Sequence, residues 1–347
     1  MKKYLLIIIF TIFATAAFSQ QSGNNKPNIN NLRLETRVDF DCFSQNDSLY
    51  SGFSGQYLNF IISGDFTKDF FYAYRQRLNN VQNISSFFDA TDYLYFGWRI
   101  TKNLSWTVGK EIVAIGGSEY DLAPIDVYFH TEFWNNINCF RFGTNLIYTT
   151  KNKKNTFTLQ FTNSPYDNSV LYGSLYNYSL QWRGEFEHFG PICSVNMFEY
   201  QKGKFQNVIA LGTTFRFGHV CGYLDLMNRA SFEQDDFFLK DMTVVGRIGY
   251  NFMHDQMQVF FKTGHDVNDA QYSNTPYDEA YDLCILPGTD IMFYGGGFEY
   301  YPMKNSKDLR IHAFFAVHDA TKNKVGNSDI TYQANAGVTW KLNFIKR

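Results

Sequence analysis

The chain has 347 residues, with 31 basic and 33 acidic side chains and a formal net charge of −2, so nothing in its charge indicates a nucleic-acid partner. Aromatic residues make up 19% of the composition, with 24 Tyr and 36 Phe against 7 Pro, while the mean hydropathy is −0.30. A helical membrane protein is excluded because no apolar run of roughly 20 residues follows the N-terminus. This composition is typical of a membrane β-barrel, which carries its apolar residues in alternation and its aromatic residues in girdles.

Residues 1–19 have the features of a secretory signal peptide. Lys2 and Lys3 form a basic start, residues 5–13 are apolar, and the small residues around Ser19 form a cleavage site. The apolar part is much shorter than the roughly 20 residues that a membrane-anchoring helix needs. We therefore expect export with cleavage after Ser19, then a short flexible lead over residues 20–31, rich in Gln, Asn, Gly and Ser, and a single domain over residues 32–347.

The mature chain is dominated by alternation with a period of two residues, the pattern of a strand with two different faces. Between residues 32 and 42, Leu34, Val38 and Phe40 fall on one face, and Glu35 and Arg37 fall on the other. Long strands with an apolar and a charged face suit a barrel whose outside contacts lipid and whose lumen contains water.

Sixteen such runs can be counted, an even number, as a bacterial barrel requires. Short connections alternate with longer ones, of which residues 111–136 and 264–287 are the longest. We therefore expect an all-β fold, a transmembrane antiparallel β-barrel with sixteen strands and an inward-folded loop. The runs start near residues 32, 53, 67, 91, 103, 137, 155, 174, 190, 205, 218, 240, 255, 289, 307 and 330.

The connection over residues 111–136 follows the fifth run and is a candidate constriction loop that narrows the lumen. Gly116 and Gly117 permit a sharp bend, and Pro124 fixes a turn. The alternative is an exposed loop whose carboxylates are simply solvated. Its acidic residues are Glu111, Glu119, Asp121, Asp126 and Glu132.

The stretch over residues 108–128, VGKEIVAIGGSEYDLAPIDVY, resembles the corresponding segment of the phosphate-selective porins of the O and P type, especially their relatives in Bacteroidota. The resemblance implies a 16-stranded outer-membrane barrel that assembles as a homotrimer and acts as a passive diffusion channel.

The last run resembles the β-signal by which outer-membrane barrels are recognised for insertion, a glycine followed by alternating large apolar residues. Its members are Gly337, Trp340, Leu342 and Phe344. The resemblance implies two partners during assembly, the barrel-assembly machinery and the lipid of the outer membrane.

Basic side chains recur on the predicted inner face, where they form a candidate pore wall. An arginine on the lipid face costs roughly 2–4 kcal/mol at the bilayer midplane, so these residues should point inward. Arginines in a pore favour anions; alternatively, they pair with wall acids such as Glu35, Asp39 and Glu185 and simply solvate the lumen. The candidates are Arg33, Arg37, Arg75, Arg77, Arg99, Arg141, Arg183, Arg216, Arg247, Lys262 and Arg310.

The function that these features favour is a porin, a passive diffusion channel for small hydrophilic solutes across the outer membrane of a Gram-negative bacterium, with a preference for anions as the finer hypothesis. One alternative is a closed barrel that serves as a structural or assembly partner, its lumen filled by Phe260, Phe293 and Phe314. A membrane-surface enzyme is a further alternative, but His312 and His318 fit a lumen lining and no catalytic signature is present. The five scattered cysteines indicate neither a zinc site nor a disulfide framework, and no cofactor, metal site or catalytic group is predicted.

Overall fold

The structure is a computed structural model that describes residues 27–45, 48–79, 87–167, 174–232, 234–271 and 283–346. The expected signal peptide over residues 1–19 lies outside the described residues. Of the expected flexible lead, residues 28–31 are instead the start of the first strand, where Asn28 and Ile29 pair with Asp65 and Gly64 of the second. The sequence predicted a flexible lead because residues 28–31 are mostly polar. Their backbone pairing with the second strand leaves no apolar alternation in the sequence.

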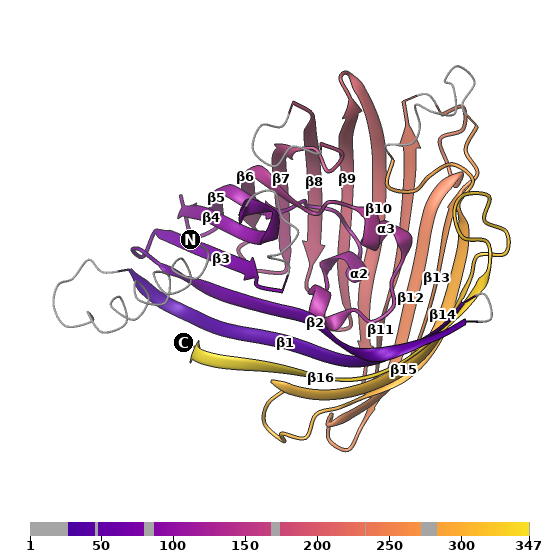
Figure 1. Cartoon of the computed structure of the whole chain (residues 1–347). Helices are drawn as coiled ribbons and strands as arrows, with labels where there is room; N and C mark the ends of the chain where they lie inside the picture. Colours follow the sequence, from indigo (N-terminus) through magenta and orange to yellow (C-terminus); the bar gives the residue numbers. More distant parts are fainter. Residues whose placement is uncertain are drawn as a thin grey trace, which may run out of the picture.

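Sixteen strands form a closed antiparallel barrel in which each strand pairs with its neighbours in the sequence (Figure 1). This confirms the predicted fold class and strand number, and most strands begin within about three residues of the predicted starts. The strands are β1 (Asn28–Gln45), β2 (Ser48–Asp65), β3 (Phe70–Arg77), β4 (Thr91–Arg99), β5 (Leu104–Ile112), β6 (Phe140–Thr149), β7 (Asn155–Asn163), β8 (Tyr176–Gly184), β9 (Phe189–Gln201), β10 (Lys204–Phe217), β11 (Val220–Ser231), β12 (Asp241–Phe252), β13 (Met257–Asn268), β14 (Asp290–Tyr300), β15 (Leu309–Asp319) and β16 (Ile330–Lys346).

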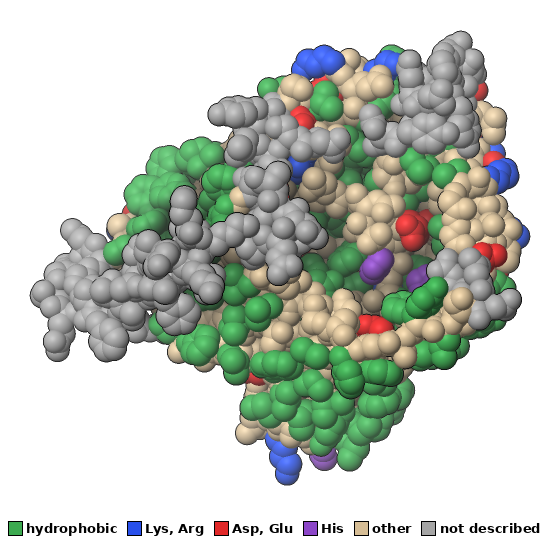
Figure 2. Space-filling view, viewed as in Figure 1, with side chains coloured by type: hydrophobic (Ala, Val, Ile, Leu, Met, Phe, Trp, Pro, Cys, Tyr) green, Lys and Arg blue, Asp and Glu red, His purple; other side chains and the backbone are tan. Residues whose placement is uncertain are grey.

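The side chains are distributed in the opposite sense to those of a soluble protein. Along β8, Leu180 is 54% exposed on the outside, whereas its neighbour Gln181 is 4% exposed and points inward. Figure 2 shows apolar side chains over much of the outer surface and a hollow in the middle where acidic and histidine side chains are visible. The alternation in the sequence therefore separates a lipid-type exterior from a polar interior.

The barrel closes where β16 pairs with β1, from Asn31 opposite Lys346 to Ser44 opposite Tyr332. Leu342 and Phe344 point outward and are 46% and 63% exposed. Gly337 lies on the inner side of this seam, where an added Cβ would stand 2.1 Å from Asp39 Oδ1 and 2.7 Å from His312 Cε1. This glycine is therefore required by a close approach of interior side chains.

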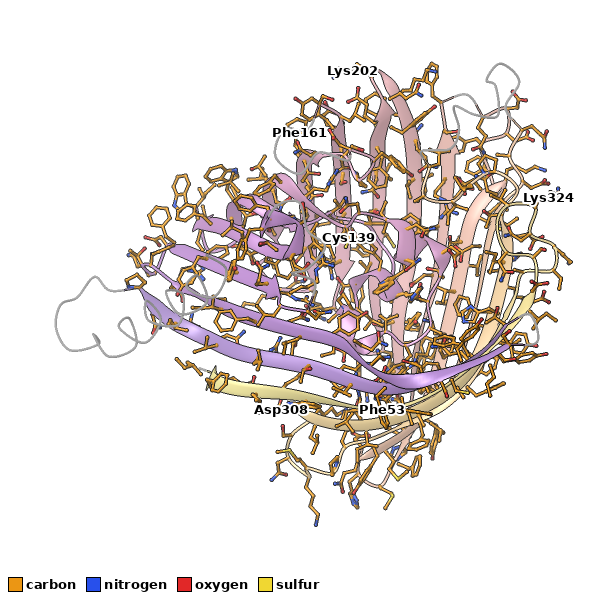
Figure 3. All side chains as sticks on the ribbon, viewed as in Figure 1. Phe53, Cys139, Phe161, Lys202, Asp308 and Lys324 are labelled. Carbon is orange, nitrogen blue, oxygen red and sulfur yellow. The ribbon has the colours of Figure 1, made fainter. Side chains whose placement is uncertain are left out.

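The two ends of the barrel differ in their connections. At the short-turn end the strands are joined by residues 66–69, 100–103, 150–154, 185–188, 218–219, 253–256 and 301–308. The long-loop end carries η1 (Phe87–Ala90) and the two longest connections, residues 113–139 and 269–289, although only residues 202–203 join β9 to β10. Lys202 and Asp308 mark the two ends in Figure 3. Within the described ranges, no helix is both long and apolar enough to span a bilayer.

Leu180→Arg should destabilise the folded barrel by roughly 2–4 kcal/mol, because the new charge would face lipid in the middle of β8. The measurement is a urea titration of protein refolded in lipid vesicles, followed by tryptophan fluorescence. Glu187→Arg, which adds an arginine in the exposed turn at residues 185–188, is the control and should unfold like the unchanged protein. Equal unfolding of both variants would contradict the outward orientation of Leu180.

Candidate functional site

The connection between β5 and β6, residues 113–139, folds into the barrel and crosses its interior. It contains α2 (Ser118–Asp121), η2 (Pro124–Asp126) and α3 (Glu132–Asn136). Near its start, the backbone N–H of Ala114 donates to Gln160 Oε1 of β7 at 2.8 Å. Further along, Ile125 O accepts a hydrogen bond from Arg310 Nη2 of β15 at 2.9 Å. The loop is thus attached to strands on distant parts of the wall.

Two carboxylates of the wall hold the short helices of this loop. Asp225 of β11 accepts hydrogen bonds from the backbone N–H groups of Ser118 and Glu119, both at 2.8 Å. Asp266 of β13 accepts one from the backbone N–H of Glu132 at 2.7 Å. Since all three donors lie at the starts of helices, where backbone N–H groups lack helical partners, these carboxylates satisfy groups that the loop cannot pair by itself.

Apolar side chains seal the loop against the wall in two clusters. In the cluster around the Phe129 side chain, Phe129 of the loop packs with Phe260, Phe293 and Phe314 of the wall. The Tyr128 ring stacks on Phe314 with a centroid distance of 5.4 Å. These three wall phenylalanines do face inward, as expected, but they fill the space between the loop and β11–β15. The other cluster comprises Val113, Ile115, Tyr120, Phe133, Ile137, Phe198, Val208, Ala210, Met227 and Ile285.

Three of the acidic residues expected in the loop make direct ion pairs with the wall. Glu119 Oε1 lies 2.6 Å from Lys262 Nζ, and Asp121 pairs with Arg183. Asp126 Oδ1 lies 2.8 Å from Arg310 Nη1, and its Oδ2 lies 3.6 Å from Lys341 Nζ. The charges of loop and wall are therefore largely compensated by contact.

The two other acidic residues have different environments. Glu111 does not belong to the loop, because β5 continues through Ile112, and it stands opposite Arg141 of β6 in the strand register. Glu132 is half-buried at the start of α3, where burial and the nearby Asp266 carboxylate raise its pKa. Burial and Lys262 lower the pKa of the neighbouring His130, which favours its neutral form.

The basic residues of the predicted wall face the interior or its rim, and most form ion pairs. Arg141 donates from Nε to Ser164 O at 2.7 Å. Acids such as Glu35, Asp39 and Asp92 are fully buried among these cations, so the interior as a whole is less basic than the sequence suggested. Besides the pairs with the loop, the ion pairs of these residues are Arg33–Glu35 (3.3 Å), Arg37–Asp39 (2.6 Å), Arg75–Glu35 (3.7 Å), Arg75–Asp92 (3.2 Å), Arg77–Asp92 (3.0 Å), Arg99–Asp65 (2.8 Å), Arg247–Glu299 (3.6 Å) and Arg310–Glu299 (3.8 Å).

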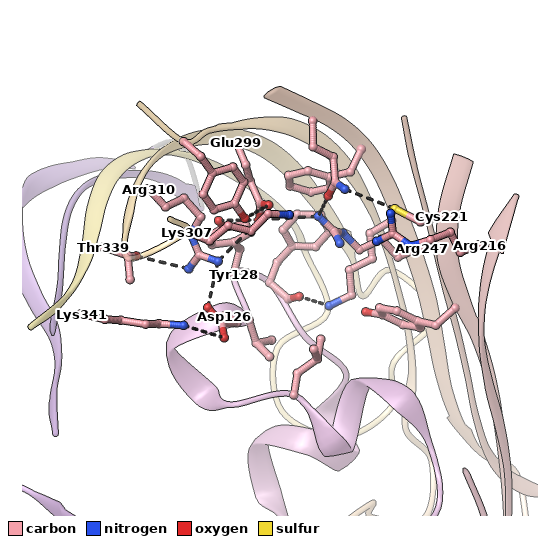
Figure 4. A pocket seen from close by; sticks show the side chains of 18 residues that line it. Asp126, Tyr128, Arg216, Cys221, Arg247, Glu299, Lys307, Arg310, Thr339 and Lys341 are labelled. Carbon is pink, nitrogen blue, oxygen red and sulfur yellow. Dashed lines mark hydrogen bonds and ion pairs between the residues drawn. The ribbon is translucent and has the colours of Figure 1, made fainter. Parts of the chain in front are cut away.

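A cavity of about 340 Å³, the inner cavity, lies between the loop and the short-turn end (Figure 4). Glu299 lies at its wall, where its carboxylate accepts hydrogen bonds from the hydroxyls of Tyr128 and Tyr301, both at 2.8 Å. Of the described residues, six basic and two acidic ones line this cavity: Arg216, Arg247, Lys262, Lys307, Arg310 and Lys341 against Asp126 and Glu299.

A second hollow of about 880 Å³, the outer vestibule, opens toward the long-loop end. Its charged lining is Arg37, Asp41, Glu132 and Asp329, together with His130 and His318. Val127, Tyr128 and Phe129 line both hollows. This three-residue segment is therefore the partition between them.

Sequence reasoning missed some residues of the inner cavity. Lys341 lies on the predicted inner face of the last strand, so alternation could have found it. Lys307 lies in a turn, where alternation carries no signal. Tyr128 and Tyr301 could not be assigned to a cavity, since their positions depend on the path of the loop and on the β14–β15 turn.

Asp225→Ala should free the loop at α2. Because a hydrogen bond to a charged acceptor contributes about 1.5–3 kcal/mol, hydrogen exchange at the amides of Ser118 and Glu119 should accelerate by roughly tenfold or more. The measurement is hydrogen exchange of the folded barrel, read by mass spectrometry on peptides from residues 113–122. Asp329→Ala removes an exposed carboxylate at the long-loop end and should leave this exchange unchanged; similar acceleration in both variants would contradict the anchoring role of Asp225.

Comparison with known proteins relates this architecture to a family. A family model described as phosphate-selective porin O and P matches residues 31–240. Similar solved structures include the outer membrane channel DcaP of Acinetobacter baumannii (TM-score 0.63, 11% identity, covering 92% of this chain and 99% of that one) and an anion-selective porin from Comamonas acidovorans (TM-score 0.61, 10% identity, covering 91% and 100%). Another is in-vitro folded OmpT of Vibrio cholerae in its trimer form (TM-score 0.56, 8% identity, covering 91% and 100%).

At these identities the structural likeness shows the fold alone, and no curated protein matches this sequence. The family match spans more than half of the chain and includes the whole inward-folded loop. The chain belongs to the phosphate-selective porin O and P family.

Proposed function

We propose that the protein is a passive diffusion channel for small hydrophilic solutes across an outer membrane. The observation that carries this proposal is the pair of hollows inside the barrel, which open toward opposite ends and share Val127, Tyr128 and Phe129. Solutes would enter the outer vestibule, pass this segment and leave through the inner cavity. Membership in a porin family supports the same function.

Preference for anions is the finer part of the proposal. The basic residues of the inner cavity outnumber the acidic ones, and guanidinium groups match the oxygens of carboxylates and phosphates. The structurally similar porin from Comamonas acidovorans is described as anion-selective. Small anions are therefore the favoured solutes.

A catalytic role has little support from the interior histidines. His312 is buried with its Nε2 3.3 Å from Asp39 Oδ1, and its ring stacks on Tyr128 with a centroid distance of 4.6 Å. His318 lines the outer vestibule beside Phe293. Neither histidine has a nucleophile beside it among its described contacts, so the proposal is a channel without enzymatic activity.

The proposal includes the route to the membrane and the assembly. The signal peptide is cleaved after Ser19, the short-turn end faces the periplasm, and the barrel-assembly machinery recognises Gly337, Trp340, Leu342 and Phe344. A homotrimer is the proposed assembly, and the OmpT structure with this fold is described as a trimer form.

Folded protein reconstituted in planar lipid bilayers should produce steady, stepwise increases in current. The expected steps follow from two hollows that meet inside one barrel. Uptake of small sugars by proteoliposomes is the second measurement. Correctly folded protein that gives neither current steps nor uptake would favour the closed-barrel alternative, with the phenylalanine cluster at the partition blocking the path.

Arg247→Gln should lower the preference for anions over cations by roughly threefold or more, because a unit charge about 7 Å from an ion contributes roughly 0.6 kcal/mol even at the dielectric constant of water, with opposite sign for anions and cations. Its side chain lines the inner cavity and is 22% exposed. The measurement is the reversal potential in a salt gradient across the bilayer. Lys102→Gln removes an exposed charge from the turn at residues 100–103 and serves as the control. A reversal potential unchanged by Arg247→Gln would argue against a role in selectivity.

A further inference from the structure

We infer that the channel conducts better at one polarity of the voltage than at the other, because the fixed charge of the lumen changes sign across the partition at residues 127–129, and that Arg216 and Lys307 sustain this asymmetry. The inference rests on the proposed channel function and adds a directional property to it.

On the inner side, the acids are already occupied by other cations. Glu299 is approached by Arg247 at 3.6 Å and Arg310 at 3.8 Å, and Asp126 by Arg310 at 2.8 Å. Arg216 and Lys307 are exposed and, within the part of the chain that the structure describes, make no ion pair. Lys307 Nζ instead lies 5.0 Å from the centre of the Tyr301 ring. The inner cavity thus keeps a surplus of positive charge.

On the outer side, the surplus has the opposite sign. Among the residues that the structure describes, the lining acids are Asp41, Glu132 and Asp329, and the single lining cation is Arg37. The Arg37 guanidinium is buried, pairs with Asp39 at 2.6 Å and donates to Val127 O at 2.7 Å, so its charge is compensated.

Asp41, by contrast, accepts hydrogen bonds from the neutral side chains Ser54, Gln56 and Asn335. Among the described residues Asp41 therefore has no cation beside it, and the described lining of the outer vestibule has a surplus of acidic side chains.

This arrangement makes the current depend on polarity. Cations gather in the acidic outer vestibule and anions in the basic inner cavity. A voltage that is positive on the long-loop side drives both kinds of ion toward the partition, which raises their local concentration and the conductance. The opposite voltage draws cations and anions away from the partition, which lowers their concentration there and the conductance. The fixed charges act on passing ions because the Debye length is about 10 Å at 0.1 M salt, comparable to the width of such a lumen.

The test is the current of single, full-length folded channels at about +100 and −100 mV in about 0.1 M KCl. The conductance should be larger with the long-loop side positive, by roughly twofold, and the ratio should approach one at about 1 M KCl, where the Debye length falls to about 3 Å. Orientation can be read from Asn327→Cys at the long-loop end, with the native cysteines changed to serine, through a membrane-impermeant maleimide added to one compartment.

Two matched double variants separate the cavity charges from the surface charges. Arg216→Gln with Lys307→Gln removes the two cations of the inner cavity that make no ion pair with a described residue, and should bring the conductance ratio most of the way to one. Lys151→Gln with Lys153→Gln removes the same charge from the exposed turn at residues 150–154, at the same end of the barrel, and should leave the ratio unchanged.

The outcomes separate the channel function from the dependence of the conductance on polarity. Current steps of equal size at both polarities, or larger steps with the short-turn side positive, would overturn the directional inference while the channel function stands. An equal loss of asymmetry in both double variants would overturn the role of Arg216 and Lys307. Folded protein without current steps would overturn the channel function and this inference with it.

Discussion

The closure of the sheet, which leaves none of the sixteen strands at an open edge, is the constraint on which the rest of the structure depends. Hydrocarbon offers no hydrogen-bond partners, so a sheet in a bilayer must have no open edge. The seam between β1 and β16 meets this condition. Once the outside must be apolar, the charged side chains of the strands are confined to a narrow interior, and their arrangement there decides what the molecule can do.

Confinement explains why the interior charges are so extensively paired. A buried charge without a partner is costly. Arg37 accordingly pairs with Asp39, and Lys262 of the wall pairs with Glu119 of the inward-folded loop. The number of inward arginines is therefore a poor measure of the electric field that a solute meets. What remains is a local surplus where the lumen widens toward water, positive around Lys307 and negative around Asp41.

Much of the barrel could be predicted from the sequence because lipid contact imposes a strict period of two on each strand. The strand number and most strand starts follow from that period, as does the inward position of Phe260, Phe293 and Phe314. The predicted start of the constriction loop was wrong at Glu111. The loop was expected to begin there because its acidic residues were grouped by function, but the alternation of β5 continues through Ile112. The partners of the loop acids could not be predicted, since they depend on how residues 113–139 cross the lumen and not on any spacing in the chain.

The attachments of the loop also have a consequence for the order of folding. Its carbonyl groups at Ile125 and Val127 are held by Arg310 and Arg37, which come from β15 and β1, at opposite ends of the sequence. Contacts between such distant residues carry a large loop-closure entropy until the sheet has brought those strands together. The nascent barrel should therefore pass through a stage in which its wall is complete and its interior is still open, with the partition at residues 127–129 the last part to take its place.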